Sequence, residues 1–501
     1  MTPTAPAAEA LAAHWIDSHE ARDGARLPIH DPATGAVARE VLLGDRATVE
    51  AAVAVATAAA REWGEVSVTG RVRVLRRWSE RITAHREDFV RIMGEEQGKV
   101  RADAEGELMR GLETLDVACS AALLLKGEIS DNVASGVDAF SIRAPLGVCA
   151  AITPFNFPLM APLYLSSIAL ACGNAMILKP SERVPSASLL MARLGEEAGV
   201  PPGVLSVVQG DRAVVEAILD DPGIAAVSFI GSSPVARQVH ARGSAAGKRV
   251  QAFGGAKNHM VVMPDADMGF AADAAVSAAY GSTGQRCMAI SVVVAVGGCG
   301  DELVAAIAER AGRVGVGPAT DDGAEMGPLI SAAAKARVEA AIEGAHGAGA
   351  TLVLDGRDHE RAGGDGFFVG PTLVDGVTPA MDVYRDEVFG PVLSVLRVDT
   401  LDEAIAAIDA NPYGNGAAIF TASGNAARTF QRRASAGMIG INVPIPIPNA
   451  VYSFGGWKDS RFGDQHMAGT EGFKFYTKQK VVTSRWPDAP DGGVSLAFPG
   501  R

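Results

Sequence analysis

The 501-residue chain has few of the residues that build metal sites or disulfide frameworks: only five cysteines and nine histidines. The cysteines are an odd number without a Cys-x-x-Cys pair, which favours free thiols in a reducing compartment over a disulfide framework or a zinc ribbon. No two histidines are spaced three or four residues apart, so the helical two-histidine metal arrangement is missing. We therefore predict no metal site and expect a cytoplasmic location.

Basic charge and long apolar runs are also scarce. The chain carries 45 basic against 58 acidic residues, a formal net charge of −13, which argues against a nucleic-acid-binding surface. No stretch approaches the roughly eighteen apolar residues of a membrane-spanning helix, and the N-terminus lacks the basic and apolar regions of a secretory signal. The Gly-x-Ser-x-Gly and Walker lysine motifs are absent as well, which argues against a serine hydrolase and a P-loop nucleotide-binding protein. We expect a soluble protein that binds neither nucleic acid nor a membrane.

Between Gly147 and Gly254 the sequence alternates short β-rich runs with helical patterns. Five runs are predicted as strands: Val148–Thr153, Ala175–Lys179, Val204–Val208, Ala225–Ile230 and Arg249–Phe253. Strict alternation predicts a parallel, doubly wound sheet because right-handed crossovers place the helices on its two faces. A nucleotide-binding domain is the natural candidate, although the dinucleotide fingerprint Gly-x-Gly-x-x-Gly is absent.

The turn Phe229-Ile230-Gly231-Ser232-Ser233-Pro234 is a candidate phosphate site. It is predicted to lead from a strand into a helix with Pro234 in the first turn, where proline is well tolerated. The free backbone N–H groups of a helix start attract phosphate. Such turns are common at strand–helix junctions.

A second αβ alternation runs from Lys257 to about Asn442 and predicts a second domain with Cys287 at its near edge. Its expected strands are Met260–Met263, Ile290–Val296, Val392–Val398, Ala417–Thr421 and Met438–Asn442.

Other segments flank these two regions. Asp45 is expected to cap a helix ending near Trp63, and Arg71–Arg86 to form an amphipathic helix with its charges at the surface. Beyond Gly469, Phe473–Tyr476 and Val481–Thr483 are β-prone. A strand formed there would be able to pair with another subunit.

Several ordered motifs resemble the aldehyde dehydrogenase superfamily and, within it, the CoA-acylating methylmalonate-semialdehyde dehydrogenases. They extend over nearly the whole chain: Thr153-Pro154-Phe155-Asn156-Phe157-Pro158, Ile177-Leu178-Lys179-Pro180-Ser181-Glu182, Ser228-Phe229-Ile230-Gly231-Ser232-Ser233-Pro234, Gly255-Ala256-Lys257-Asn258-His259, Gly284-Gln285-Arg286-Cys287, Glu387-Val388-Phe389-Gly390-Pro391 and Phe454-Gly455-Gly456-Trp457-Lys458-Asp459-Ser460.

The resemblance implies an α/β fold with a Rossmann-type cofactor domain, an αβ catalytic domain and a small β oligomerisation arm. The implied NAD-binding domain covers 1–122 and 142–253, and the catalytic domain covers 254–465. The arm and the C-terminal tail cover 123–141 and 466–501. Relatives with such an arm form dimers or tetramers, so the resemblance implies a homo-oligomer.

Cys287 takes the role of catalytic nucleophile in this resemblance. A thiolate attacks an aldehyde carbon readily, and the hemithioacetal that forms can expel a hydride. By similarity, Asn156 supplies the side-chain amide of an oxyanion hole together with the backbone N–H of Cys287. Without the resemblance, Cys287 would be interpreted as a small buried hydrophobe and Asn156 as a turn residue.

The resemblance also implies NAD as cofactor. The matching positions are Thr153, Phe155, Lys179, Glu182, Gly231, Ser232, Glu387 and Phe389. Among them, Lys179 and Glu182 match the residues that hold the adenosine ribose, Ser232 the pyrophosphate, and Glu387 with Phe389 the nicotinamide ribose side. A carboxylate accepts hydrogen bonds from a ribose 2′-hydroxyl but repels a 2′-phosphate, so Glu182 favours NAD over NADP.

Phe253 lies thirty-four residues before Cys287, where hydrolytic members of the superfamily carry a glutamate base. A phenyl ring cannot abstract a proton from water. Relatives without the glutamate form acyl-CoA, so the resemblance implies that the thiol of coenzyme A releases the acyl group. From the sequence, Phe253 either lines a coenzyme A path or fills space in the core.

Two arginines match the positions that pair with the substrate carboxylate in this subfamily: Arg110, in Leu108-Met109-Arg110-Gly111-Leu112-Glu113, and Arg286. A guanidinium grips a carboxylate with two parallel hydrogen bonds. The implied substrate is methylmalonate or malonate semialdehyde. After oxidation by NAD, the thioacyl enzyme would lose carbon dioxide and transfer propionyl or acetyl to coenzyme A. Without the family match, Arg110 would be interpreted as a surface helix residue.

Two alternatives stay open at this point. A CoA-independent aldehyde dehydrogenase would hydrolyse its thioester with another base, for which His259 is the nearest candidate in the sequence. A catalytically silent structural or binding protein on the same fold is the other alternative. The presence of Cys287, Asn156 and the two cofactor acids argues against it.

Overall fold

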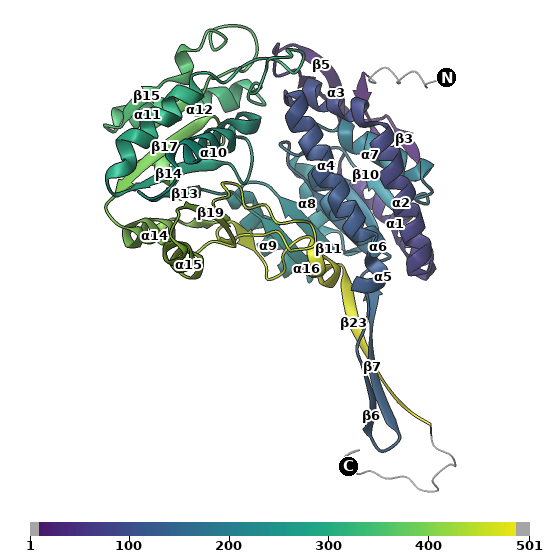
Figure 1. The fold of residues 1–501 in the computed structure, drawn as a ribbon. Coiled ribbons are helices and arrows are strands. Elements are labelled where there is room, and N and C mark those ends of the chain that lie inside the picture. Colours follow the sequence, from purple (N-terminus) through teal and green to yellow (C-terminus); the bar gives the residue numbers. More distant parts are fainter. Residues whose placement is uncertain (1–9, 487–501) are drawn as a thin grey trace.

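The structure, a computed structural model, describes residues 10–486. Two α/β lobes lie side by side, and a narrow β arm projects below them (Figure 1). The predicted first domain and C-terminal tail therefore extend, at 1–9 and 487–501, outside the described residues. Within the described part, no helix combines the length and the apolar character that crossing a membrane requires.

The first lobe is built on an eight-stranded sheet of order β22-β12-β11-β8-β9-β10-β2-β3. The strands are β22 (Arg461–Phe462), β12 (Arg249–Phe253), β11 (Ile224–Ile230), β8 (Val148–Ile152), β9 (Ala175–Lys179), β10 (Leu205–Val207), β2 (His14–Ile16) and β3 (His19–Ala21). The strands from β12 to β10 run parallel, and the others pair antiparallel at the edges. All five runs predicted between Gly147 and Gly254 form the parallel part. Strand β22 adds residues from the region predicted as catalytic domain to this sheet.

Helices cover both faces of the first sheet, because successive side chains of a strand point to opposite sides. In β8, Val148 and Ala150 pack in the apolar cluster of one face, and Cys149 and Ala151 in that of the other. One face carries α1 (Arg46–Glu65), α8 (Arg212–Asp220) and α9 (Ser233–Ala245). The other carries α2 (Val68–Ala84), α3 (Arg86–Gln97), α4 (Arg101–Ala118), α5 (Ala121–Leu124), α6 (Met160–Ala171) and α7 (Ser186–Glu197). This arrangement confirms the doubly wound architecture.

The second lobe contains a seven-stranded sheet of order β15-β16-β17-β14-β13-β19-β20. Its strands are β15 (Thr351–Leu354), β16 (Thr372–Asp375), β17 (Val392–Val398), β14 (Ile290–Val296), β13 (Asn258–Val262), β19 (Gly416–Phe420) and β20 (Met438–Ile441). Only β15 pairs antiparallel. Helices α10 (Met268–Tyr280) and α11 (Gly300–Ala311) cover one face. The other face carries α12 (Ala332–Gly347), α13 (Asp382–Arg385), α14 (Leu401–Ala410) and α15 (Gly424–Arg433).

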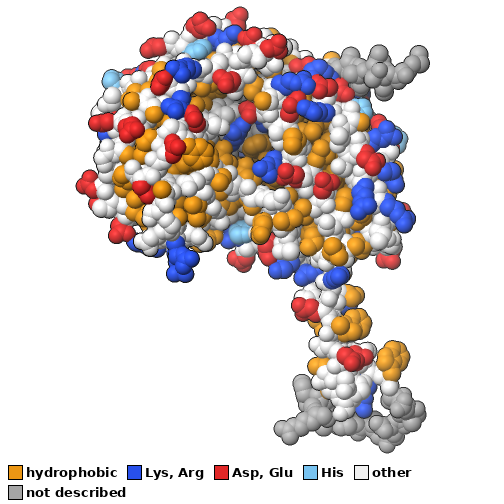
Figure 2. Space-filling model, in the orientation of Figure 1, with side chains coloured by type: hydrophobic (Ala, Val, Ile, Leu, Met, Phe, Trp, Pro, Cys, Tyr) orange, Lys and Arg blue, Asp and Glu red, His pale blue; other side chains and the backbone are white. Residues whose placement is uncertain are grey.

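Strands β6 (Ile129–Ala134), β7 (Val137–Pro145) and β23 (Thr477–Arg485) form the projecting arm, in the order β23-β7-β6. Every residue of β6 is exposed. Hydrophobic side chains stand out along the arm in Figure 2, and Ile129, Ile142 and Val481 are among its exposed apolar residues. The predicted strand at Val481–Thr483 lies within β23.

Two smaller sheets complete the described strands. One has the order β1-β5-β4, with β1 (Leu11–Ala12), β5 (Val37–Leu43) and β4 (Ala25–His30), and the other pairs β18 (Tyr413–Gly414) with β21 (Trp457–Lys458).

Two local expectations are wrong. Phe473–Tyr476 does not form a strand. Phe473 and Phe475 lie in helix α16 (Gly469–Phe475), and their rings and that of Tyr476 are buried in the first lobe. Tertiary burial overrides their β propensity. Arg71 is not at the surface: its buried guanidinium donates to the carbonyl oxygens of Ala171 (3.0 Å) and Gly64 (3.3 Å). It thereby satisfies free carbonyls at the C-terminal ends of α6 and α1.

The carboxyl ends of the central parallel strands lie next to the second lobe. Strands β8, β9, β11 and β12 end at Ile152, Lys179, Ile230 and Phe253, and all four residues line one cavity with residues of the second lobe. In open α/β sheets, ligands bind at this edge.

Candidate active site

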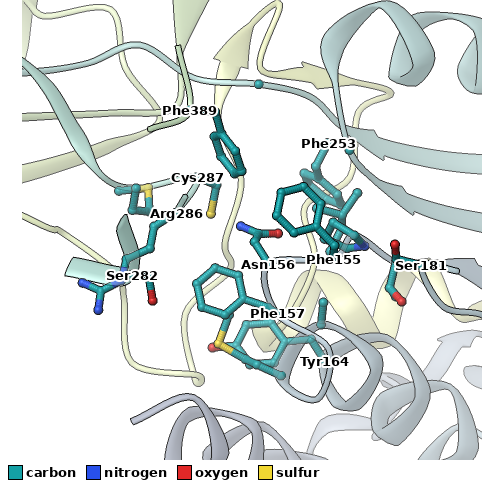
Figure 3. A pocket seen from close by; sticks show the side chains of 18 of the residues that line it. Phe155, Asn156, Phe157, Tyr164, Ser181, Phe253, Ser282, Arg286, Cys287 and Phe389 are labelled. Carbon is teal, nitrogen blue, oxygen red and sulfur yellow. The ribbon is translucent and has the colours of Figure 1, made fainter. Parts of the chain in front are cut away.

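A cavity of about 750 Å³ lies between the lobes. The residues around it come from the ends of the parallel strands, from α4 and α6, and from the segments around residues 287, 387 and 454. Figure 3 shows Cys287 and Asn156 facing each other, with the aromatic rings of Phe155, Phe157 and Phe389 around them. Such a mostly apolar pocket with a few convergent polar groups is typical of a small-molecule site.

Cys287 follows a tight turn held by contacts from distant parts of the chain. Ser282 and Thr283 in this turn have positive φ angles of 49° and 58°, a conformation that L-residues other than glycine rarely adopt. Asp103 Oδ2, on α4, accepts hydrogen bonds from the backbone N–H (2.8 Å) and hydroxyl (3.0 Å) of Ser282. These contacts fix the turn in a conformation that the local sequence would not choose.

The side-chain amide of Asn156 faces the same turn. Its Nδ2 donates to the carbonyl oxygen of Gln285 at 2.9 Å, which leaves its second N–H available toward the Cys287 thiol (Figure 3). On the other side, Lys99 Nζ donates to the backbone oxygen of Asn156 at 2.9 Å. Asn156 is therefore held on one side by Lys99 and on the other by the segment that carries Cys287.

The environment of Cys287 opposes ionisation of its thiol. Burial, and secondarily the charge of Glu387, raise the pKa of Cys287 to about 12. The backbone N–H groups of Cys287 and Met288 and the guanidinium of Arg286 act in the opposite direction. A cysteine reacts as its thiolate, so the groups that favour ionisation would increase the reactivity of Cys287.

Glu387 is a second buried titratable group in the cavity. Burial raises its carboxyl pKa to about 7, although the N–H of Ala256 donates to Oε1 at 2.8 Å and Lys257 lies nearby. The adjacent Phe389 has a positive φ of 55°, and its ring packs edge-on against Phe155 with the centroids 5.9 Å apart. Glu387 is thus a carboxyl group that changes charge near neutral pH.

At the other end of the cavity, Lys179 Nζ lies 3.0 Å from Glu182 Oε2. Burial opposes the charge of Glu182, but Lys179 outweighs it together with backbone hydrogen bonding, and the pKa of Glu182 is held below its usual range. Gly231 and Ser232 line the cavity just before α9. A side chain at Gly231 would come within 2.5 Å of the Phe229 ring, so glycine is required there.

The two predicted substrate arginines line the cavity, and each is paired with a carboxylate. The guanidinium of Arg286 forms an ion pair with Asp103, and Figure 3 shows it extending away from the Cys287 thiol along the wall near Ser282. Arg110 Nη1 lies 2.8 Å from Glu113 Oε2 at the half-exposed rim. Neither guanidinium is therefore left without a counter-charge.

Phe253, the last residue of β12, is buried and lines the cavity. Its ring also packs against the backbone at Gly455, where an added side chain would come within 3.2 Å. It both lines the pocket and fills space. His259 lies elsewhere: its Nε2 is 3.0 Å from the Tyr384 hydroxyl, it is absent from the cavity lining, and burial lowers its pKa to about 3. His259 is therefore not placed to act as a base on an acyl-Cys287.

Comparison with known proteins identifies the family. Residues 15–482 match the aldehyde dehydrogenase family. This chain belongs to the aldehyde dehydrogenase family. It is 47% identical over 490 residues to the malonate-semialdehyde dehydrogenase of Pseudomonas aeruginosa, covering 97% of this chain and 99% of the relative.

Solved structures give the same picture. The methylmalonate-semialdehyde dehydrogenase of Oceanimonas doudoroffii superposes with a TM-score of 0.95 at 47% identity, over 96% of this chain and 99% of that one. A putative methylmalonate-semialdehyde dehydrogenase from Sinorhizobium meliloti, complexed with NAD, gives 0.94 at 45% identity, again over 96% and 99%. The resemblance to this family found in the sequence is confirmed.

The cavity of this aldehyde dehydrogenase brings together the predicted catalytic, cofactor and substrate residues, but not His259. Its lining includes the predicted catalytic pair, the cofactor positions and the substrate arginines: Cys287, Asn156, Thr153, Phe155, Lys179, Glu182, Gly231, Ser232, Glu387, Phe389, Arg110 and Arg286. Residues that the sequence did not single out hold these groups in place. Lys99, which is paired with Glu107, and Asp103 make the contacts to Asn156 and Ser282. Asn258 and Asn415 donate to the carbonyl oxygen of Cys287. Asp103 precedes Arg110 by two helical turns on α4, so a search for polar residues on that helix face would have found it. Among the described residues, no group of three or more potential ligands is arranged to hold a metal ion.

Proposed function

We propose that this aldehyde dehydrogenase oxidises methylmalonate or malonate semialdehyde with NAD and transfers the decarboxylated acyl group to coenzyme A. The observation that carries the proposal is the cavity in which Cys287 and Asn156 meet beside Arg286, with Phe253 at the position of a water-activating base. The products would be propionyl-CoA or acetyl-CoA. The names of the similar proteins support this substrate class.

The residues present fit NAD. The Thr153 hydroxyl oxygen is buried in the cavity wall without a hydrogen-bond partner, which suits a wall completed by a ligand. Lys179 and Glu182 are suited to ribose hydroxyls, and the N-terminus of α9 at Ser232 is suited to a pyrophosphate. When bound, NAD accepts a hydride from the substrate carbon.

The thiolate form of Cys287 begins the reaction: its sulfur forms a bond to the aldehyde carbon while the electron pair of the C=O π bond moves to oxygen. The aldehyde oxygen then carries the negative charge, and the Asn156 amide and the backbone N–H of Cys287 stabilise it. Loss of a hydride from the same carbon restores the carbonyl and leaves a thioester on Cys287. The carboxylate of the substrate is held meanwhile by Arg286 and Arg110.

The thioester of a β-carboxylic acid is activated for decarboxylation. The bond to the carboxylate breaks, carbon dioxide leaves, and the electron pair moves into the thioester carbonyl, whose oxygen still faces Asn156. Protonation of the α-carbon gives the shorter acyl group. The coenzyme A thiolate then attacks the carbonyl, and the bond to Cys287 breaks to return the thiolate. Phe253 cannot deprotonate water, so the acyl group waits for this thiol.

NADH formation tests the proposal. Wild-type protein is mixed with NAD and either semialdehyde, with and without coenzyme A, alongside Cys287→Ala. We expect steady turnover only with coenzyme A, a burst of one NADH per site without it, and neither in Cys287→Ala. Equal steady turnover without coenzyme A would contradict the acylating mechanism and favour a CoA-independent aldehyde dehydrogenase.

We also infer a homo-oligomer, a dimer or tetramer, formed through the arm. The open edge of β6 and the exposed Ile129 and Val481 support this proposal, since unpaired strand edges with apolar side chains favour pairing. The two sheets and the arm support a division into two domains and an arm, although β22 and α16 pack in the first lobe. Five free cysteines support a reducing, cytoplasmic compartment. Light scattering on the purified protein measures the subunit number, and a monomer would contradict the inference.

A further inference from the structure

Two asparagine side chains meet at the backbone carbonyl of the nucleophile. Asn258 Nδ2 donates to the carbonyl oxygen of Cys287 at 2.9 Å, and Asn415 Nδ2 donates to the same oxygen at 3.0 Å. Asn258 is the first residue of β13, and Asn415 lies between β18 and β19. Both side chains are buried. Neither asparagine contacts the turn at Ser282 and Thr283, which is held by Asp103 and by the carbonyl oxygen of Gly327.

The orientation of the Asn258 amide is fixed by its other contacts. Asn258 Oδ1 accepts a hydrogen bond from the backbone N–H of Gly416 at 3.0 Å, so the Nδ2 group must face the opposite way. This Nδ2 also donates to the carbonyl oxygen of Ala289 at 2.9 Å. Asn415 Nδ2 lies 3.0 Å from Met288 Sδ. Gly416 permits this packing, since a side chain there would approach Met288 Cε to 2.6 Å.

The carbonyl of Cys287 belongs to the peptide unit whose other end is the N–H of Met288. In a trans peptide the C=O and N–H bonds point in opposite directions. With its oxygen held by two amides, this unit turns its N–H toward the Cys287 sulfur, in agreement with the lowering of the Cys287 pKa by the Met288 N–H. Hydrogen bonds to a peptide oxygen also polarise the unit and strengthen its N–H as a donor.

We propose that Asn258 and Asn415 are positioning residues that hold the Cys287–Met288 peptide so that its N–H stabilises the nucleophilic thiolate. The inference rests on the proposed function only in taking Cys287 as the nucleophile. It is independent of the semialdehyde, of the decarboxylation and of the acyl acceptor.

Other charged groups also act on the Cys287 sulfur. Glu387, before β17, raises its pKa, and Arg286, in the turn itself, lowers it. Tyr164, on α6, is electrostatically coupled to Cys287, and Asp103 is paired with Arg286. None of these four residues is changed when either asparagine is replaced by a neutral side chain, so we expect a change in thiol ionisation to report on the peptide.

The experiment measures alkylation of Cys287 by iodoacetamide as a function of pH in the ligand-free protein. Asn258→Leu and Asn415→Leu remove the Nδ2 donors while keeping a side chain of similar volume. Mass spectrometry identifies the alkylated cysteine. Below the thiol pKa the rate is proportional to the thiolate fraction. We expect each variant to raise the thiol pKa by about one unit, which is about a tenfold slower alkylation at a fixed pH. The double variant should show a larger shift.

Asn411→Leu is the matched control. Asn411 is as buried as Asn258 and accepts from the N–H of Tyr413 at 3.0 Å, but it does not contact Cys287. Its replacement should lower stability and leave the alkylation profile unchanged. Cys287→Ala gives the background from the four other cysteines.

Folded Asn258→Leu and Asn415→Leu proteins with the wild-type alkylation profile would overturn the inference. If the leucine variants do not fold, Asn258→Ser and Asn415→Ser carry the same test, because a hydroxyl on the shorter side chain cannot reach the Cys287 carbonyl. The assay uses neither substrate nor coenzyme A. Its failure is therefore separate from a failure of the proposed function, which would appear as steady turnover without coenzyme A.

Discussion

Lys99 Nζ lies 2.6 Å from Glu107 Oε2, and both side chains are completely removed from solvent. Lys99 also donates to the backbone oxygen of Asn156 at 2.9 Å. Glu107 Oε1 accepts from the N–H groups of Leu159 (2.8 Å) and Met160 (3.0 Å), at the start of α6. The pair therefore ties α4 to the loop that presents the Asn156 amide to Cys287.

Breaking this buried pair should damage both stability and catalysis. Lys99→Met leaves the Glu107 carboxylate buried without its cation, which costs about 3–5 kcal/mol of unfolding free energy. The Asn156 loop then loses one anchor, so the NADH burst should slow more than substrate binding weakens. Denaturant unfolding and stopped-flow absorbance measure the two effects.

Arg101→Met is the control for Lys99→Met. Arg101 pairs with Glu87 on the exposed surface at 2.7 Å, where ion pairs contribute little. We expect no measurable change in stability or burst rate. A Lys99→Met protein as stable as Arg101→Met would show that the buried pair does not hold the loop.

Arg286 should discriminate between charged and neutral aldehydes. Arg286→Gln removes a guanidinium suited to two parallel hydrogen bonds with a carboxylate. We expect KM for malonate semialdehyde to rise by about ten- to a hundredfold, as for loss of a charged hydrogen bond, while KM for propanal changes little. Arg313 is exposed and lies just after α11, so Arg313→Gln should leave KM for both aldehydes unchanged. Equal loss for the two aldehydes would mean that Arg286 only supports the turn.

Cofactor binding should depend on pH through Glu387. Its carboxyl pKa is raised to about 7 by burial, so the group gains a proton, and loses acceptor capacity toward ribose hydroxyls, as the pH falls through about 7. NADH affinity, followed by fluorescence titration, should therefore weaken from pH 8 to pH 6. Glu387→Gln should be weaker at pH 8 and nearly flat across this range. A wild-type pH profile retained in Glu387→Gln would assign the titration to another group.

Phe253 should control whether water can replace coenzyme A. Phe253→Glu places a carboxyl group in the cavity wall, and a positioned general base accelerates such a step by about 10²–10⁴-fold. We expect steady NADH formation without coenzyme A to appear in this variant. Phe253→Leu removes the ring without adding a base and should keep the burst. A folded Phe253→Glu protein that still stops after one turnover would show that position 253 cannot activate water.

Local sequence patterns determined most of the secondary structure. The strands Ala175–Lys179, Arg249–Phe253, Ile290–Val296 and Val392–Val398 have the bounds that their apolar runs predict. Asp45 caps α1 because its carboxylate accepts from the nearby Thr48 N–H at 2.9 Å. These features depend on residues close together in the chain, and such interactions are encoded by propensity and spacing. The family motifs likewise predicted catalytic roles for Cys287 and Asn156 and a set of cofactor residues, and all of these line the cavity.

Only the tertiary structure decided how those residues are held. Asp103 and Ser282 are 179 positions apart, Asn156 and Gln285 129, and Cys287 and Asn415 128, so no local pattern joins them. The sequence around Arg71 likewise predicts a surface charge, but its guanidinium is buried because the terminal carbonyls of α6 and α1 lie beside it. For Phe473–Tyr476, burial in the first lobe decides between strand and helix. The sequence by itself, through its family motifs, selected residues that the structure brings into one cavity. Their orientation, protonation and partners depend on burial and hydrogen bonds that exist only when distant segments pack together.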